Sequence, residues 1–378
     1  MTRAPERRIL LVGPLPMRRK EGVSTSFQSL VDGLSGDEAS VINTNWMREV
    51  QNPGRFNPGR AFESLIVVFR VLLTAWRFQS VYLIVATSRL GFIRDASVVL
   101  AARLFGCRVV GHLHGGGMRR FYISGGTMQR CMIRAVYGQF AILIVLGDRL
   151  RSQFRFMRQP QRLRIVPNGL PADVQVTADR QKELDFPLRI LYLSNITPSK
   201  GITDVLRAIA VLDKTTDVEL NVCGAFLSDV DVGAEQGATA FKAELKRLID
   251  DLGIAGKVSF HGTVSGDLKE TMLETSHILV LPTYYRWEGQ PLSIIEAQAY
   301  GLPVVTTAHR AIPETVEFGK SAERCEPRDH QSIVAAIRRI AESQQTYTQY
   351  STAARDNYRD RFTTQTHIEN MRRVLFEA

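Results

Sequence analysis

Short apolar runs alternate with helical patterns along almost the whole chain. Eleven such runs have the length and character of strands: Ile9–Val12, Ser40–Ile42, Val81–Val85, Arg108–His112, Ala141–Val145, Leu163–Val166, Arg189–Leu193, Glu219–Cys223, Lys257–His261, Ile278–Leu281 and Pro303–Thr306. Strands that alternate with helices in this way are typical of parallel, doubly wound sheets. The pattern therefore predicts an α/β protein.

The chain has 378 residues, enough for two domains that each bury a core, with a cleft between them. A polar stretch without apolar periodicity, Thr177 to Pro187, is the best candidate for the linker. We therefore expect one domain over residues 1–180 and a second over residues 181–360. Residues 361–378 contain a last helix, Thr364 to Phe376, whose apolar stripe needs a surface to cover.

Composition places the chain among ordinary globular proteins, with 44% hydrophobic and 23% charged residues. Its four cysteines are scattered without metal-binding or disulfide spacing, which fits a reducing cytosol. The charged segment Met1 to Arg8 leads straight into the first strand and lacks the apolar core of a signal peptide. We therefore expect a cytoplasmic protein.

The net charge of +10 is unevenly distributed along the chain. Residues 1–178 contain 25 basic and 10 acidic residues, a balance of +15, whereas the remainder contains 23 basic and 28 acidic residues, a balance of −5. Nucleic acid, an anionic membrane surface or an acidic acceptor could each bind such a basic half, and so could solvent alone.

Two basic helix candidates bear on this choice. Arg60 to Gln79 has an apolar stripe beside a polar one, but its uncharged runs are too short to span a membrane. Met118 to Phe140 carries four arginines among aromatic residues and methionines. Helices of this kind suit docking at an anionic lipid surface, and packing on a sheet explains their apolar positions equally well.

The most informative stretch runs from Tyr284 to Ala297, where the strand Ile278–Leu281 gives way to a helix. Open α/β sheets bind substrates at such places, and free N–H groups at a helix amino end favour phosphate or carboxylate. Glu288 stands before the helix and Glu296 one or two turns into it, able to reach the hydroxyls of a ligand. Alternatively, Ser293 and Glu296 form a capping box that only stabilises the helix.

Several ordered motifs resemble those of the retaining glycosyltransferases of family 4, which have the GT-B architecture of two Rossmann-like domains. Glu288 and Glu296 match that family's E-x7-E element. The other matching segments are Arg189–Gly201, Tyr300–Val305, Ile165–Gly169 and Ile312–Glu314 in or near the carboxyl half, and Gly13–Val23 and His112–Gly115 in the amino half. The match is specific in the carboxyl half and looser in the amino half.

The resemblance implies that the carboxyl domain binds a nucleotide-sugar donor, that the amino domain binds the acceptor, and that the last helix packs back on the amino domain. It implies catalytic roles for His114 near the reacting carbon, for Lys200 at the diphosphate and for Glu288 at a sugar hydroxyl. The implied donor-binding residues are Gly22, Asn195, Lys200, Gly224, Gly262, Val264, Glu288, Gly289, Gln290, Pro291, Leu292, Ser293 and Glu296, the last of these at the ribose.

Two positions depart from the family pattern. Ser194-Asn195 stands where the family usually has Gly-Arg, so a guanidinium on the diphosphate is missing and Lys200 carries more of the charge. Gly22 stands alone where many members have a pair of glycines. Both departures concern the residues that would face the donor's phosphates.

The implied function is transfer of a hexose, with retention, from a nucleotide-diphosphate donor to a saccharide acceptor. The acceptor would be lipid-linked at the inner membrane face, as in the synthesis of cell-surface polysaccharide or glycolipid. No metal and no cofactor are required, since the nucleotide-sugar is a substrate. The alternative is a non-catalytic GT-B protein that binds saccharide or a partner.

Two other classes fit the sequence poorly. An NAD-dependent oxidoreductase would need a G-x-G-x-x-G loop after Val12, which the sequence lacks. A nucleic-acid-binding protein would need a recognised binding motif, and none is present.

Overall fold

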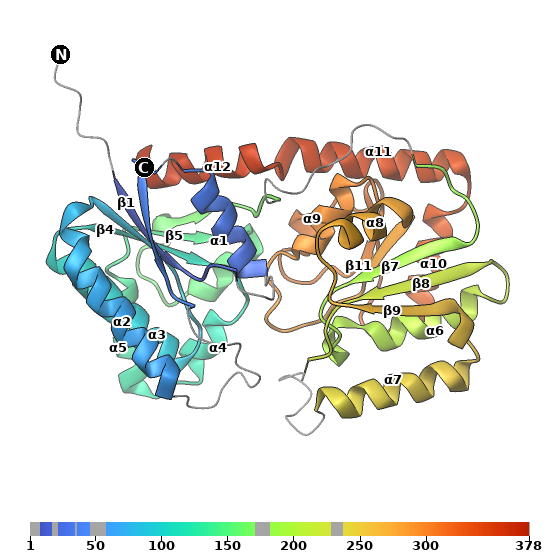
Figure 1. Cartoon of the computed structure of the whole chain (residues 1–378), viewed down its shortest axis with the longest axis horizontal. Coiled ribbons are helices and arrows are strands. Elements are labelled where there is room, and N and C mark those ends of the chain that lie inside the picture. Colours follow the sequence, from blue (N-terminus) through green and yellow to red (C-terminus); the bar gives the residue numbers. More distant parts are fainter. Residues whose placement is uncertain are drawn as a thin grey trace, which may run out of the picture. The chain divides into compact units, whose positions relative to one another are not determined.

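Two six-stranded sheets, both wholly parallel, organise the chain (Figure 1). The first has the order β2-β1-β3-β4-β5-β6, with strands β1 (Ile9–Gly13), β2 (Ala39–Asn43), β3 (Ser80–Ile84), β4 (Arg108–Leu113), β5 (Ile142–Val145) and β6 (Leu163–Ile165). The second has the order β12-β11-β10-β7-β8-β9, with strands β7 (Leu188–Leu193), β8 (Val218–Cys223), β9 (Val258–Gly262), β10 (Ile278–Leu281), β11 (Val304–Thr306) and β12 (Ala322–Arg324).

The computed structural model describes residues 8–16, 22–34, 36–45, 58–170, 182–227 and 237–377. Its contacts divide the chain into two units, one made of Met1–Asp173 and Thr363–Ala378 and the other of Val174–Phe362. Residues 177–181 of the expected linker, and residues 17–21 of the expected glycine loop, lie outside the described residues. All eleven predicted strands are confirmed, and the doubly wound α/β fold with them.

Helices cover both faces of the first sheet (Figure 1). On one face α2 packs against α3 and α3 against α5, and on the other α1 packs against α12. The helices of this unit are α1 (Gly22–Asp32), α2 (Pro58–Thr74), α3 (Arg89–Leu104), α4 (Met118–Ile123), α5 (Thr127–Tyr137) and α12 (Thr364–Arg372), with short 3-10 turns at Ala75–Arg77, Asp148–Phe154 and Pro160–Arg162 and a π turn at Arg373–Glu377.

The prediction of one helix over Met118 to Phe140 was wrong. The chain forms two helices, α4 and α5, separated by Ser124, Gly125 and Gly126. Glycine has the lowest helix propensity after proline, and Gly126 has an extended backbone, with a φ of −65° and a ψ of 175°, at the amino end of α5. The glycine pair therefore ends one helix and starts the next.

The end of the chain completes the core of the first unit. Ile368, Met371, Val374 and Leu375 pack in one buried cluster with residues of β1, β3, β4, β5 and α1. The Arg108 guanidinium, at the start of β4, donates to the carbonyl oxygens of Val374 and Leu375 at 3.2 and 3.0 Å. The last helix thus packs on the amino-terminal sheet, as the resemblance implied.

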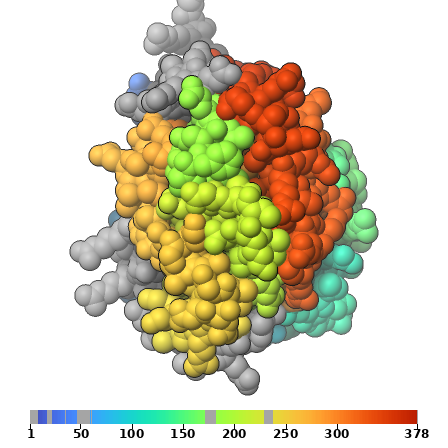
Figure 2. Space-filling model, turned by 90° about the vertical axis from the view of Figure 1, so that its right-hand side faces the viewer, coloured from blue at the N-terminus to red at the C-terminus, as the bar shows by residue number. Residues whose placement is uncertain are grey.

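The second sheet also has helices on both faces. On one face α6 packs with α7 and α10, and on the other α9 packs with α11. Figure 2 shows α7 in yellow and α11 in red at the surface of this unit. Its helices are α6 (Ile202–Leu212), α7 (Ala238–Leu252), α8 (Asp267–Thr275), α9 (Leu292–Ala299), α10 (His330–Ile340) and α11 (Gln344–Arg361), with 3-10 turns at Pro198–Lys200, Ala255–Lys257 and Ile312–Glu314.

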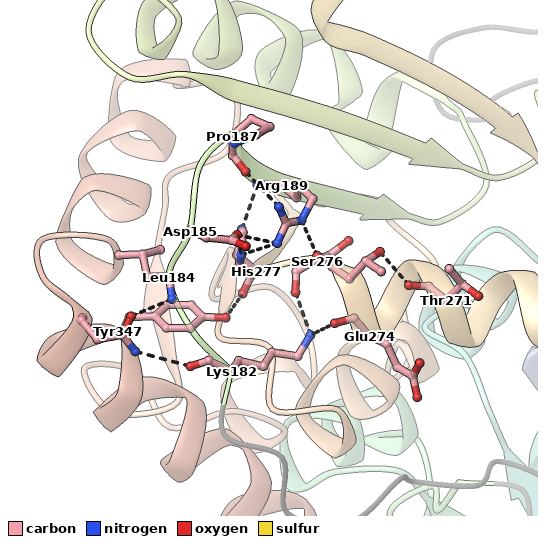
Figure 3. A network of polar contacts seen from close by, with 12 residues as sticks. Lys182, Leu184, Asp185, Pro187, Arg189, Thr271, Glu274, Ser276, His277 and Tyr347 are labelled. Carbon is pink, nitrogen blue, oxygen red and sulfur yellow. Dashed lines mark hydrogen bonds and ion pairs between the residues drawn. The ribbon is translucent and has the colours of Figure 1, made fainter.

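A polar network fastens the chain where it enters the second unit (Figure 3). The Lys182 ammonium group donates to three carbonyl oxygens at the carboxyl end of α8, at 2.7 to 2.8 Å. The His277 Nδ1 atom accepts from the Arg189 backbone N–H at 2.9 Å, so the ring proton is on Nε2, 2.8 Å from an Asp185 carboxylate oxygen. The Lys182 contacts satisfy carbonyl oxygens at the end of α8, which have no partner within the helix.

Candidate active site

The strand order of the second sheet reverses between β7 and β10. Its first strand, β7, has β8 on one side and β10 on the other, so the chain winds outward both ways from this point. In open parallel sheets the loops at the carboxyl ends of such neighbouring strands diverge and leave room for a ligand. The loop after β7 carries Lys200, and the loop after β10 carries Glu288.

These two loops join through an ion pair. The Lys200 Nζ atom lies 2.6 Å from Oε2 of Glu288, and the two side chains are 13% and 8% exposed. The same carboxylate oxygen accepts a hydrogen bond of 2.8 Å from the Thr283 hydroxyl, at the end of β10. A lysine and a glutamate 88 residues apart in sequence therefore form one charged centre at the switch point.

The backbone around Lys200 is held tightly. Lys200 ends a short 3-10 turn, and Gly201 then adopts a left-handed conformation with a φ of +79° before α6 begins. A Cβ atom on Gly201 would lie 2.6 Å from the carbonyl oxygen of Pro282. Tyr284 donates from its backbone N–H to Ser199 at 2.8 Å and from its hydroxyl to Pro198 at 3.0 Å. Glycine is required where the loops after β7 and β10 come this close.

The helix after the Gly-Gln-Pro turn begins without a side-chain cap. It starts at Leu292, with Pro291 as its cap residue and no side-chain cap. The alternative of a capping box from Ser293 to Glu296 is therefore not realised. The first N–H groups of a helix have no acceptor within it, which makes them donors for an anion.

Glu296 lies in the second turn of α9 and makes a second ion pair. Its Oε1 atom is 2.7 Å from Nζ of Lys269 in α8, with the side chains 8% and 24% exposed. The Glu296 carboxylate is thus largely buried and paired with a cation through one oxygen. As a pure hydrogen-bond acceptor it suits ligand hydroxyls.

The remaining predicted donor residues of this unit follow the neighbouring strands. The Gly224 N–H donates to the Gly262 carbonyl at 2.7 Å, and a Cβ on Gly224 would lie 1.8 Å from the Ser194 carbonyl oxygen. Val264 is buried and Asn195 is exposed. Gly289, Gln290 and Pro291 are buried just before α9, and Ser293 lies in its first turn.

The other two predicted residues, His114 and Gly22, belong to the first unit. His114 follows β4, and its ring centroid lies 3.9 Å from that of His112. Burial, with a further contribution from the charge of His367, lowers the pKa of His114 to about 3, although Asn168 nearby raises it in part. His114 is therefore neutral at pH 7. Gly22 is exposed and starts α1.

Two residues that contact the site's carboxylates, Thr283 at Glu288 and Lys269 at Glu296, were missed by sequence reasoning. Thr283 directly follows a strand and precedes Glu288 by five positions, so its place after β10 was a usable signal. Lys269 lies on a different helix from Glu296, 27 positions away, and no motif connects them. Only the packing of α8 beside the carboxyl end of the sheet reveals that pair.

Part of the chain matches a protein family and several known proteins. Residues 176–357 match the family described as "Glycosyl transferases group 1". The MMP alpha-(1->4)-mannosyltransferase of Mycolicibacterium hassiacum is 28% identical over 189 residues, which cover 50% of this chain and 42% of that protein. The amylovoran biosynthesis glycosyltransferase AmsK of Erwinia amylovora is 28% identical over 165 residues, which cover 43% of this chain and 38% of that protein. These alignments thus span less than half the length of either relative.

Solved structures resemble the whole described fold. HepE of Anabaena, in complex with UDP and glucose, has a TM-score of 0.75 at 17% identity, covering 98% of this chain and 100% of that one. A sucrose-phosphate synthase from Thermosynechococcus elongatus has a TM-score of 0.72 at 15% identity, covering 97% of both chains. At these identities the likeness shows the fold alone. The matched family and the GT-B fold together support a glycosyltransferase.

Proposed function

We propose that this protein is a retaining glycosyltransferase that moves a hexose from a nucleotide-diphosphate donor to a saccharide acceptor. The observation that carries the proposal is the Lys200–Glu288 pair at the switch point of the second sheet. It lies in the loops beside the amino end of α9, which has no side-chain cap and whose first N–H groups can donate to phosphate.

The chemistry follows from the leaving group. Breaking the bond between the sugar and the diphosphate leaves negative charge on the phosphate oxygens, and a fixed cation with oriented N–H groups stabilises that charge. Lys200 supplies the cation, and the first N–H groups of α9 supply the dipoles. A carboxylate at Glu296 accepts from the ribose hydroxyls. We propose that the reaction needs no metal and no cofactor.

Glu288 is assigned to a hydroxyl of the donor sugar and not to nucleophilic attack. Its Oε2 atom already accepts from Lys200 and Thr283, and both contacts make a carboxylate a weaker nucleophile. Its other oxygen suits a sugar hydroxyl. In the first unit, neutral His114 is the residue proposed to contact the transferred sugar, as a hydrogen-bonding group without charge.

The acceptor proposed is a lipid-linked saccharide at the inner face of the membrane. Support comes from relatives named for amylovoran biosynthesis, AmsK, and for colanic acid biosynthesis, the putative glycosyltransferase WcaL of Salmonella typhimurium. No helix among the described residues is long and apolar enough to cross a membrane. UDP is the first donor nucleotide to try, since HepE was solved with UDP and with UDP-glucose.

The experiment is thermal unfolding with UDP, GDP, ADP, CMP and NAD. A ligand at 100 times its dissociation constant adds about 2.7 kcal/mol to stability, which raises the Tm by roughly 5–10 °C in a unit of this size. We expect a shift with one nucleoside diphosphate, lost in Glu296→Ala. Asp251→Ala, which removes an exposed carboxylate at the end of α7, is the matched control and should keep the shift.

Turnover tests the other assignments. Lys200→Ala and His114→Ala should cut the rate of transfer far more than Asp251→Ala does. Equal rates in all three variants would contradict the site, and a Tm shift with NAD alone would contradict the donor class.

A further inference from the structure

Helix α2 and the 3-10 turn Ala75–Arg77 that follows it carry a row of large apolar side chains that do not pack on the sheet. Phe62, Leu65, Phe69, Leu72, Leu73 and Trp76 are 38% to 68% exposed. At 100° per residue the five on α2 fall within one third of the helix circumference, whereas the buried positions Val67 and Val71 lie on the opposite side. The apolar stripe that the sequence shows is therefore not the face that packs in the core.

The neighbouring helix repeats this arrangement. On α3, Leu90, Ile93, Leu100 and Leu104 are 41% to 75% exposed and recur at the same helical spacing. Helices α2 and α3 lie side by side on one face of the first sheet (Figure 1). We call the two exposed stripes together the α2–α3 face. Its α3 part was not anticipated from the sequence.

Ten large apolar side chains on two adjacent helices exceed what single scattered surface residues explain. Contiguous apolar patches on soluble proteins usually mark sites of binding to another protein or to a membrane. The occupant must accordingly be apolar in part, because water gains nothing from these side chains.

The charges of the first unit bear on the second property of the occupant. Residues 58–170 contain seventeen arginines and no lysine, against the three acidic residues Glu63, Asp95 and Asp148. Asp95 is buried and pairs with Arg94 at 2.7 Å, and Asp148 pairs with Arg151 at 3.3 Å. Arginine's planar fork of donors matches phosphate oxygens better than the point charge of lysine does. Arg108 and Arg162 donate to backbone carbonyl oxygens within the unit, so the excess of arginine gives the first unit a basic field that favours phosphate without placing every arginine at the face.

Two arginines lie beside the apolar row. Arg70 is exposed and projects about 80° round α2 from Phe62, and Arg77 is exposed in the 3-10 turn that follows, next to Trp76. The Arg77 guanidinium lies 4.8 Å from the centroid of the Trp76 ring. Aromatic and aliphatic side chains bordered by cations are the pattern of helices that lie in a lipid headgroup layer.

We propose that the α2–α3 face docks on a membrane surface rich in anionic phospholipid, with its apolar side chains among the acyl chains and its arginines at the phosphates. This docking rests on the proposed function, because a lipid-linked acceptor would lie at such a surface. A second copy of the chain is a poorer occupant, because two such faces would bring like charges together. Nucleic acid is poorer as well, because it offers no apolar layer for the aliphatic side chains.

The experiment is co-sedimentation of the full chain with vesicles of phosphatidylcholine alone and with 30% phosphatidylglycerol added. We expect binding to the anionic vesicles only, weakened by salt. Phe69→Glu with Trp76→Glu, and separately Ile93→Glu with Leu104→Glu, should each lower the partition coefficient at least about tenfold. Arg77→Gln should lower it about fivefold, the amount one cation contributes at such a surface.

Phe186→Glu is the matched control, since Phe186 is 59% exposed in the second unit, and it should bind as the wild type does. Unchanged binding in both double variants, equal binding to neutral vesicles, or tighter binding to RNA than to vesicles would overturn the proposal. A dimer in solution that the same variants dissociate would overturn it in favour of a second copy.

The nucleotide Tm shift separates this proposal from the proposed function. Each face variant should keep the shift, which also shows that it is folded. Vesicle binding without any nucleotide shift would leave the docking face in place and remove the donor assignment. A nucleotide shift without vesicle binding would keep the donor assignment and remove the docking face.

Discussion

Removing the Lys200 ammonium group should destabilise the second unit by about 3 kcal/mol. The Glu288 carboxylate is 8% exposed and has two described donors on one oxygen, Lys200 at 2.6 Å and the Thr283 hydroxyl at 2.8 Å. In Lys200→Met the carboxylate keeps only the neutral donor. Breaking a buried pair on one side costs about 3–5 kcal/mol, and the lower end applies because Lys200 itself is 13% exposed.

The double variant decides whether the cost comes from an unpaired charge. Lys200→Met combined with Glu288→Gln replaces the uncompensated carboxylate by a neutral amide of similar size. It should therefore be more stable than Lys200→Met alone, by at least about 1 kcal/mol. If the cost came only from lost packing of the lysine stem, the second substitution would restore nothing.

Urea unfolding followed by tryptophan fluorescence measures this in the second unit alone. The chain has three tryptophans, and replacing Trp46 and Trp76 by phenylalanine leaves Trp287, the neighbour of Glu288, as the reporter. Lys320→Met is the matched control, because its pair with Glu317 is 3.7 Å long and 71% and 46% exposed, so it should cost under about 1 kcal/mol. A Lys200→Met variant as stable as this control would refute the reasoning.

Two further predictions concern the rest of the site. Because the pKa of His114 falls from 6.5 to about 3 on folding, the unfolded chain binds more protons than the folded chain between these pH values, and stability is lost as the pH falls through that window. The variant His114→Asn should therefore recover up to about 2 kcal/mol of unfolding free energy at pH 5 and nothing at pH 8, measured by urea unfolding. Gly201→Ala should cost more than Gly253→Ala, because both have positive φ, +79° and +69°, but only Gly201 would place a Cβ against a backbone oxygen at 2.6 Å; equal midpoints in urea would contradict this.

Local sequence patterns predicted most of the fold. Eleven of the twelve strands were predicted from mainly apolar runs between turn residues, which are the signals that periodicity detects. The strand β12 has the sequence Ala-Glu-Arg and sits at the sheet edge, so neither its composition nor its length distinguishes it from a loop. It was not predicted.

The site was predictable only in part, because its pairs depend on the register of separate elements. Glu288 and Glu296 could be found from their positions around a strand-to-helix turn. That Lys200 would pair with Glu288, and Lys269 with Glu296, depends on how the loop after β7 and helix α8 pack beside β10. The sequence also could not reveal which stripe of α2 is buried, since both sides of that helix carry aliphatic residues.

The first unit is made of two separate pieces of the chain, with the whole second unit between them. Its core lacks Ile368, Met371, Val374 and Leu375 until those residues have been synthesised. At about 5–20 residues per second, the 189 residues from Val174 to Phe362 take roughly 10–40 s to make. During that time β1 and α1 lack their last apolar neighbours, so the amino-terminal unit, although it begins first, cannot complete its core until the whole carboxyl-terminal unit has been synthesised.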